Sequence, residues 1–256
     1  MSKGLLFAAA AAALAIATPA AALPIDTFQA FGSTTWATTP TQARQTSADI
    51  NARGVLVSME DYGPSRFTGG LSVQTTSDDD FIGLVFGFDQ ADETNPFFLI
   101  SWKQGDQSGS IEGWTLSKVT GGVAAAPFAN HQTSSPGAFD VIATDVGAGK
   151  GWADNTAYDV SLTYLEDRIL FEAALAGDPL ATIFDVGPGD VPGGGPFQAG
   201  GFGFYNFSQD DAVYDGFERT DLTPRPPSGE VPLPPALALM AAAFGGLGWA
   251  ARRRRG

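Results

Sequence analysis

Short strand-like runs separated by glycine- and aspartate-rich turns constrain the fold of this chain more than any other feature. Residues 23–222 contain no convincing run with the 3.6-residue apolar period of an amphipathic helix. They contain instead many runs of about five to nine residues that are rich in β-branched and aromatic side chains. The predicted strands are 55–59, 67–75, 81–88, 97–102, 111–119, 138–145, 157–165, 168–175, 181–186, 201–208 and 213–219.

Two of these runs indicate how the strands are arranged. Within residues 157–165, apolar and polar side chains alternate from Tyr158 to Tyr164. Glu166-Asp167 forms a tight turn into 168–175, which predicts a hairpin. Residues 81–88 are apolar on both faces, which is typical of a central strand covered on both sides. With 32 Gly, 17 Pro and 44 % apolar residues, the chain is predicted to form one all-β jelly-roll sandwich over 23–222.

Charge and composition exclude several classes of function. Residues 23–222 hold eight basic and 27 acidic side chains, a formal charge of −19, which repels the phosphates of nucleic acids and favours hard divalent cations. The chain has no cysteine, so disulfides, thiolate zinc sites and iron–sulfur clusters are excluded. Its single histidine, His131, lies in a polar stretch that is predicted to be an exposed loop.

The N-terminus has the pattern of a secretory signal peptide. A basic start with Lys3 precedes an apolar run over 5–17, and small residues follow Pro19 up to a predicted cleavage site after Ala22. Residues 1–22 are therefore expected to direct export, although a buried alanine-rich helix would have a similar composition.

The C-terminus has three parts in a fixed order. A proline-rich linker over 223–230 is followed by a motif, an apolar run over 236–251 and an arginine cluster. The motif is Val231, Pro232, Leu233 and Pro234, and the cluster is Arg252, Arg253, Arg254 and Arg255. Sixteen helical residues span about 24 Å, just short of a hydrocarbon core, and the arginines would stop translocation on the cytoplasmic side.

This tail, residues 231–256, resembles the PEP-CTERM family of bacterial sorting signals, in its Val-Pro-Leu-Pro-Ala (VPLPA-CTERM) variant, with Pro235 in place of the alanine. The resemblance implies a transient transmembrane anchor, an exosortase-type membrane protease as partner, and release to the cell surface or extracellular space. The alternative is a plain tail anchor that is never cut.

Three adjacent carboxylates, Asp78, Asp79 and Asp80, stand immediately before the apolar strand that begins at Phe81. They repel one another, so they are either a solvated acidic turn or the ligands of a Ca²⁺ ion, which binds six to eight oxygens. Charge alone does not separate these two interpretations.

The residues around this cluster resemble the thrombospondin C-terminal domain. That domain has an Asp-Asp-Asp-aromatic strand and a strand ending in Trp-Lys-Gln, which correspond here to 78–88 and 97–104. Gly-led segments at 113–119, 151–152 and 200–209, the hairpin after Tyr158 and an opening strand at 28–31 follow the same order, so the similarity runs from about residue 26 to 221. The resemblance implies a lectin-like jelly roll of the concanavalin and laminin-G type that binds Ca²⁺ in an extracellular adhesion or matrix role.

The chain also departs from that family. It lacks the Asp-rich calcium repeats, the cysteines and any Arg-Gly-Asp tripeptide. The receptor partners of animal thrombospondins are therefore not expected here.

Other candidate residues carry less information. Asp210, Asp211 and Asp215 are expected to lie in an acidic turn, because no Asp-x-Asp-x-Asp-Gly loop is present. The aromatic side chains of Trp102, Trp114 and Trp152 suit a sugar-stacking platform, but in a sandwich they are more often core.

The sequence argues against catalysis. Jelly-roll glycoside hydrolases place two carboxylates across a cleft, and their Glu-x-Asp-x-x-Glu strand signature does not occur. No Gly-x-Ser-x-Gly elbow surrounds a serine. We therefore expect a non-enzymatic, surface-displayed calcium-binding adhesion or matrix module. A lectin-like module for exopolysaccharide is the alternative, and a polysaccharide hydrolase is a third hypothesis.

Overall fold

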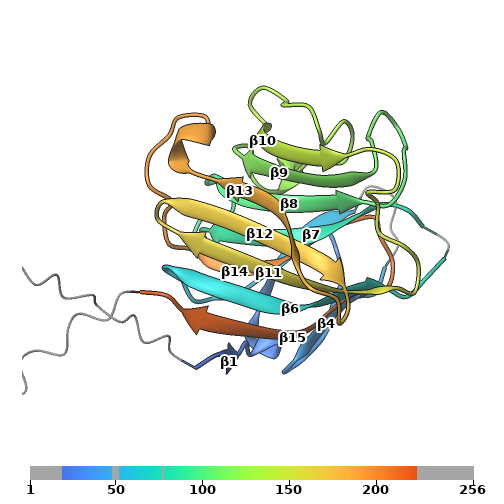
Figure 1. The fold of residues 1–256 in the computed structure, drawn as a ribbon, viewed down its shortest axis with the longest axis horizontal. Helices are drawn as coiled ribbons and strands as arrows, with labels where there is room; N and C mark the ends of the chain where they lie inside the picture. The colour runs from blue at the N-terminus through green and yellow to red at the C-terminus, as the bar shows by residue number, and fades with distance from the viewer. Residues whose placement is uncertain (1–18, 48–51, 77, 224–256) are drawn as a thin grey trace, which may run out of the picture. The chain divides into compact units, whose positions relative to one another are not determined.

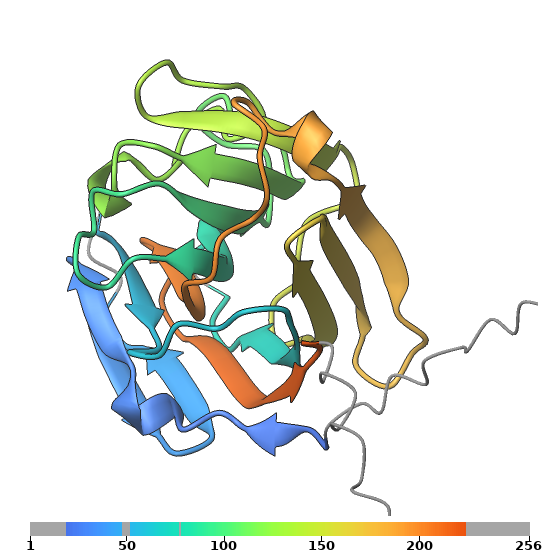
Figure 2. The same cartoon turned by 90° about the vertical axis from the view of Figure 1, so that its left-hand side faces the viewer.

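Two antiparallel β-sheets pack face to face in the computed structural model, which describes residues 19–47, 52–76 and 78–223 (Figure 1). The two layers are also seen from a second direction in Figure 2. Sheet A has the order β13-β12-β11-β6-β15-β4-β3, with β1 paired to β15. Sheet B has the order β10-β9-β8-β7-β14-β5-β2.

The strands have these bounds. Sheet A contains β1 (Ala21–Ala22), β3 (Trp36–Thr39), β4 (Gln42–Gln45), β6 (Ser65–Val73), β11 (Ala157–Leu165), β12 (Arg168–Leu175), β13 (Ala181–Val186) and β15 (Ala212–Asp221). Sheet B contains β2 (Gln29–Gly32), β5 (Arg53–Val57), β7 (Phe81–Phe88), β8 (Phe97–Lys103), β9 (Gly113–Val119), β10 (Phe139–Val146) and β14 (Gly201–Phe207). Three short 3₁₀ turns complete the described secondary structure: η1 (Ile25–Thr27), η2 (Val123–Ala125) and η3 (Pro188–Asp190).

The predicted all-β jelly-roll sandwich is confirmed, and all eleven predicted strands are present within about two residues of their expected ends. The hairpin at Glu166-Asp167 is formed as expected, with Leu165 paired to Arg168. Strand β7 is central and buried on both faces, also as expected. The strands β3 and β4 were not predicted, because the runs WATT and QARQ have little apolar content for a pattern to detect.

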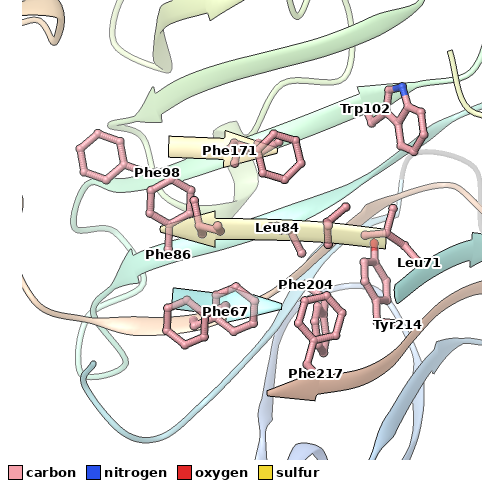
Figure 3. Packing of buried hydrophobic residues seen from close by; sticks show 14 of the residues in the cluster. Phe67, Leu71, Leu84, Phe86, Phe98, Trp102, Phe171, Phe204, Tyr214 and Phe217 are labelled. Carbon is pink, nitrogen blue, oxygen red and sulfur yellow. The ribbon is translucent and has the colours of Figure 1, made fainter. Parts of the chain in front are cut away.

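The main core fills the space between the two sheets (Figure 3). Its aromatic rings pack directly on one another: Phe67 of sheet A stacks on Phe202 of sheet B with 4.0 Å between ring centroids. Trp102 and Trp114, which are paired across β8 and β9, stack at 3.9 Å. Burial of so much aromatic surface is the dominant stabilising contribution to such a sandwich.

A second, smaller core covers the opposite face of sheet B. It contains Phe81, Val85 and Leu99 from the sheet, and Val123 and Ala126 from the segment between β9 and β10. The hydroxyl of Tyr205 donates a hydrogen bond to the carbonyl of Pro127, at 2.6 Å, and so fastens this segment to the sheet. Sheet B is consequently buried on both faces, whereas sheet A presents one face to solvent.

Several predicted segments lie outside the described residues. These are most of the signal peptide, the linker over 224–230, the motif Val231–Pro234, the apolar run over 236–251 and the arginines 252–255. Within the part of the chain that the structure describes, no helix is long and apolar enough to cross a membrane. Ala21 and Ala22, the last residues of the predicted signal peptide, form β1, so cleavage after Ala22 would remove that strand.

Candidate metal centre

The three aspartates of the sequence motif lie together where β7 begins. One carboxylate oxygen from each of Asp78, Asp79 and Asp80 lies within 4.8 Å of the others. All three side chains are partly buried, so they are not a fully solvated turn. Among the described residues this is the one group of three or more potential metal ligands that meets these distances.

A buried lysine compensates part of this negative charge. Lys103 ends β8, directly opposite Phe81, and its side chain has no solvent exposure. Its ammonium donates to the backbone carbonyl of Asp79, and lies 3.2 Å from Asp79 Oδ1 and 3.7 Å from Asp80 Oδ1. Three carboxylates against one ammonium leave a formal charge of −2 at the centre.

The turn between β14 and β15 closes the other side of the cluster. The backbone N–H of Asp80 donates to Gln209 Oε1 at 2.9 Å, and the Ser208 hydroxyl acts to lower the pKa of the Asp80 carboxyl. Ser208 and Asp211 both have φ in the left-handed region, at 58° and 54°. Non-glycine residues adopt such angles at a free-energy cost, which often accompanies functional sites.

Asn206, on the neighbouring strand β14, has a side-chain oxygen without a hydrogen-bond partner. Its Nδ2 donates to the carbonyl of Gln209 at 2.8 Å, but its Oδ1 is buried and accepts no hydrogen bond. Asn206 is paired with Ile82, which places it on the same face of sheet B as Asp80, diagonally across the ladder. A buried amide oxygen without a donor costs about 1–3 kcal/mol unless a cation or water satisfies it.

The environment also disfavours the ionised form of the cluster. Burial, followed by repulsion from Asp80, raises the pKa of Asp78 to about 6 from its ordinary value of 3.8. Burial raises the pKa of Asp80 as well, although the Lys103 ammonium acts in the opposite direction. Carboxylates that are costly to ionise in the apo protein gain most when a cation neutralises them.

The donor set fits a hard divalent cation. It offers carboxylate oxygens, a formal charge of −2 and a nearby amide oxygen, with no nitrogen or sulfur donor in the cluster. Ca²⁺ prefers such oxygen ligands and adapts to irregular geometry, whereas Mg²⁺ demands a near-ideal octahedron. Asp78, Asp79 and Asp80 are the residues that would hold the ion.

The three tryptophans are core residues. Trp102, Trp114 and Trp152 are all buried between the sheets, so a surface platform for sugar stacking is excluded. The Nε1 of Trp102 donates to the carbonyl of Lys150 at 2.7 Å, which fixes the ring from its polar end. The interpretation of these residues as core is confirmed.

The prediction that His131 is an exposed loop residue is wrong. The ring is fully buried and packs edge-on against Phe81, with 5.1 Å between centroids. Its Nε2 lies 2.8 Å from the carbonyl of Ile111 and its Nδ1 lies 3.1 Å from Ser101 Oγ. The polar neighbours of His131 in the sequence gave no sign of its burial, because in this polar stretch only the histidine side chain packs against the outer face of sheet B.

The other acidic residues serve different purposes. Asp211 forms an ion pair of 2.7 Å with Arg44, and Asp210 Oδ1 accepts the backbone N–H of Asp211. These two residues form the acidic turn that was expected. Asp215 does not lie in that turn but within β15, where its side chain is exposed on the outer face of sheet A. Sequence analysis also missed Lys103 and Asn206, since only the fold brings Lys103 into contact with the cluster and places Asn206 on the strand beside it.

The two-layer architecture, with both cores and the acidic end, defines a lectin-like jelly-roll β-sandwich. The family model of the thrombospondin C-terminal region matches residues 34–220, so the chain belongs to this family.

Individual relatives are distant. Human thrombospondin-2 is 29 % identical over 124 residues, which cover 43 % of this chain and 10 % of thrombospondin-2. Among solved structures, the Ca²⁺- and mannose-bound exoplasmic/lumenal domain of VIP36 superposes with a TM-score of 0.54 at 12 % identity, over 78 % of this chain and 85 % of that one. A protein of unknown function with a galectin-like fold from Bacillus subtilis gives a TM-score of 0.55 at 13 % identity, over 80 % and 96 % of the two chains. At these identities the structural matches establish the fold alone.

Proposed function

We propose that this chain is an exported calcium-binding adhesion or extracellular-matrix module without catalytic activity. The observation that carries the proposal is the acidic cluster with its formal charge of −2, raised carboxylate pKa values and unsatisfied Asn206 oxygen. Membership of the thrombospondin C-terminal family and the fold shared with a Ca²⁺-bound lumenal domain support the same assignment. The signals predicted in residues 1–22 and 231–256 would direct export, exosortase processing and display at the cell surface.

The ion would act mainly as a structural clamp. It would join the start of β7 to the β14–β15 turn, because the backbone N–H of Asp80 already donates to Gln209 of that turn. Neutralising the cluster would remove the repulsion among the three carboxylates and leave the left-handed turn in one conformation. A rigid end of the sandwich is a suitable base for a binding surface, since less ordering entropy is then lost on binding.

Thermal unfolding of the full-length protein in EDTA, in CaCl₂ and in MgCl₂ tests this proposal. A ligand at about 100 times its dissociation constant adds about 2.7 kcal/mol to native stability. For a domain of this size that raises the melting temperature by roughly 5–10 °C. The rise should be absent in the triple variant Asp78→Asn, Asp79→Asn, Asp80→Asn.

A matched control changes the charge equally at exposed positions, with Glu93→Gln, Asp167→Asn and Asp178→Asn. This control should keep the calcium response. A calcium response retained by the cluster variant would refute the assignment of the ion to Asp78–Asp80.

Carbohydrate binding is the second candidate function, with surface exopolysaccharide as the partner. It is favoured by a solvent-facing groove on sheet A that is lined by hydrogen-bonding groups. The VIP36 domain of the same fold is described as mannose-bound. The two candidates are compatible, because an ion that orders the end of the sandwich leaves sheet A free.

A further inference from the structure

A groove of about 560 Å³ crosses the outer face of sheet A. Three residues from three adjacent strands form one row across it: Asp159 of β11, Gly70 of β6 and Asp215 of β15. Both aspartates are in register with Gly70. The two carboxylate-bearing residues therefore stand two strand spacings apart, about 9–10 Å, with a bare glycine between them.

The floor of the groove is low because Gly70 has no side chain. A Cβ at this position would meet only the carbonyl oxygens of Tyr158 and Asp215, at 3.6 and 3.7 Å, which are ordinary van der Waals distances. Neither packing nor backbone conformation therefore requires glycine here. This contrasts with Gly83 of β7, where a Cβ would lie 2.0 Å from the carbonyl of Ile100.

The walls carry hydrogen-bond acceptors, and the acceptor on one wall is preorganised. Asp159 Oδ2 accepts the backbone N–H of Gly177 at 2.8 Å, which orients that carboxylate and leaves its second oxygen available. Asp215 is exposed. Thr68 and Ser72 flank Gly70 along β6 and add hydroxyls, while Leu180, 40 % exposed, provides apolar surface at the rim.

The chemistry of these groups selects the occupant. No lysine, arginine or histidine lines the groove, and two carboxylates do, so an acidic polymer would be repelled. Carboxylates accept strong charge-assisted hydrogen bonds from hydroxyls, and the threonine and serine hydroxyls both donate and accept. A neutral, hydroxyl-rich ligand satisfies all of these groups.

We propose that this groove binds a neutral polysaccharide, with one sugar unit seated over Gly70 between Asp159 and Asp215. This inference rests on the second candidate function above and names its surface and its ligand class. The groove is separate from the acidic cluster, although the same turn borders both: the N–H of Gln74, which lines the groove, donates to the carbonyl of Asp211 at 3.0 Å.

Titration calorimetry of the full-length protein tests this with dextran and mannan as neutral probes, alginate as an acidic probe and poly-L-lysine as a cationic one. We expect binding of a neutral polysaccharide and none of alginate. Gly70→Val, which raises the floor, and Asp215→Asn should each weaken that binding at least tenfold. Glu218→Gln removes one charge from an exposed position of the same strand outside the groove, and should leave binding unchanged.

Each result decides the question. If the Gly70→Val variant does not fold, the Ser72→Gln variant is used in its place, because the longer side chain fills the same floor of the groove. Equal binding of a neutral polysaccharide by wild type and the floor variants overturns this inference but leaves carbohydrate binding intact. Binding of poly-L-lysine alone, or of no probe, overturns the inference, and a calcium titration of the same sample then decides the calcium proposal separately.

Discussion

The ammonium of Lys103 is the internal counter-ion of Asp79, with Nζ 3.2 Å from Oδ1 and a second hydrogen bond to the Asp79 carbonyl. The lysine has no exposed side-chain surface, whereas the Asp79 side chain is 41 % exposed. The charge of the cluster is therefore partly compensated from the protein side, and the cluster is open toward solvent on the other. An ion arriving from solvent would meet the remaining charge of −2.

Replacement of Lys103 should change the affinity for Ca²⁺ and the stability of the fold in opposite directions. Lys103→Gln leaves three carboxylates without a buried cation, so it should lower the free energy of unfolding in EDTA by roughly 2–4 kcal/mol. The more negative cluster should then bind Ca²⁺ several-fold more tightly, as calorimetry would report. Lys118→Gln, on the neighbouring strand β9, is the control and should change neither quantity substantially. Weaker calcium binding by Lys103→Gln would contradict the assigned role of the lysine.

The raised pKa of Asp78 predicts a specific pH dependence. Because its folded pKa of about 6 exceeds the ordinary 3.8, the folded state holds the proton more readily, and ionised Asp78 opposes folding. In EDTA the Asp78→Asn variant should therefore be more stable than wild type at pH 7, with the difference vanishing as pH falls to about 4. In CaCl₂ the order at pH 7 should reverse. Denaturant unfolding at several pH values measures both, and equal stability at every pH in EDTA would contradict the prediction.

His131 gives a second pH-dependent signal of opposite sign. Burial lowers its pKa to about 4 from 6.5, so stability from the neutral ring is present above 6.5 and lost as pH falls toward 4. Since the chain has one histidine, its two carbon-bound ring protons give a single, readily assigned pair of histidine signals in NMR. The titration midpoint should lie near 4. A midpoint near 6.5 would mean that the ring is solvated and that the segment over sheet B does not bury it.

The stacked tryptophans should contribute strongly to stability. Trp114→Ala removes a ring that packs on Trp102 and Phe171, which should lower the free energy of unfolding by about 3–5 kcal/mol. Leu175→Ala, at an exposed position, should change it by less than about 0.5 kcal/mol. Chemical denaturation compares the two. A Trp114→Ala variant whose free energy of unfolding falls no more than that of Leu175→Ala would show that this part of the core is placed wrongly.

Patterns local to the chain predicted most of the fold. The alternation at 157–165 and the unbroken apolar run at 81–88 gave the correct strands and the correct burial, because period and composition are properties of single segments. The polar strands β3 and β4 escaped detection, since pairing stabilises them rather than their own sequence: β4 pairs with β15, and β3 pairs with β4.

The candidate site was predictable only in part. Three consecutive aspartates are visible in the sequence. The order of strands in sheet B is what brings Lys103 into contact with them and places Asn206 on the adjacent strand. The same limit applies to the row of Asp159, Gly70 and Asp215, which comes from three strands far apart in the sequence. Strand order and register, which one sequence does not reveal, decide which polar residues meet.

The most direct test of the central claim is a calcium titration of the full-length protein at pH 7.4 by calorimetry, on wild type and Asp78→Asn. The account predicts saturable binding of Ca²⁺ to wild type that millimolar Mg²⁺ does not displace, and at least tenfold weaker binding to the variant. Two results would contradict a calcium centre at Asp78, Asp79 and Asp80. One is the absence of both detectable heat and stoichiometric binding in wild type, and the other is equal binding in both proteins.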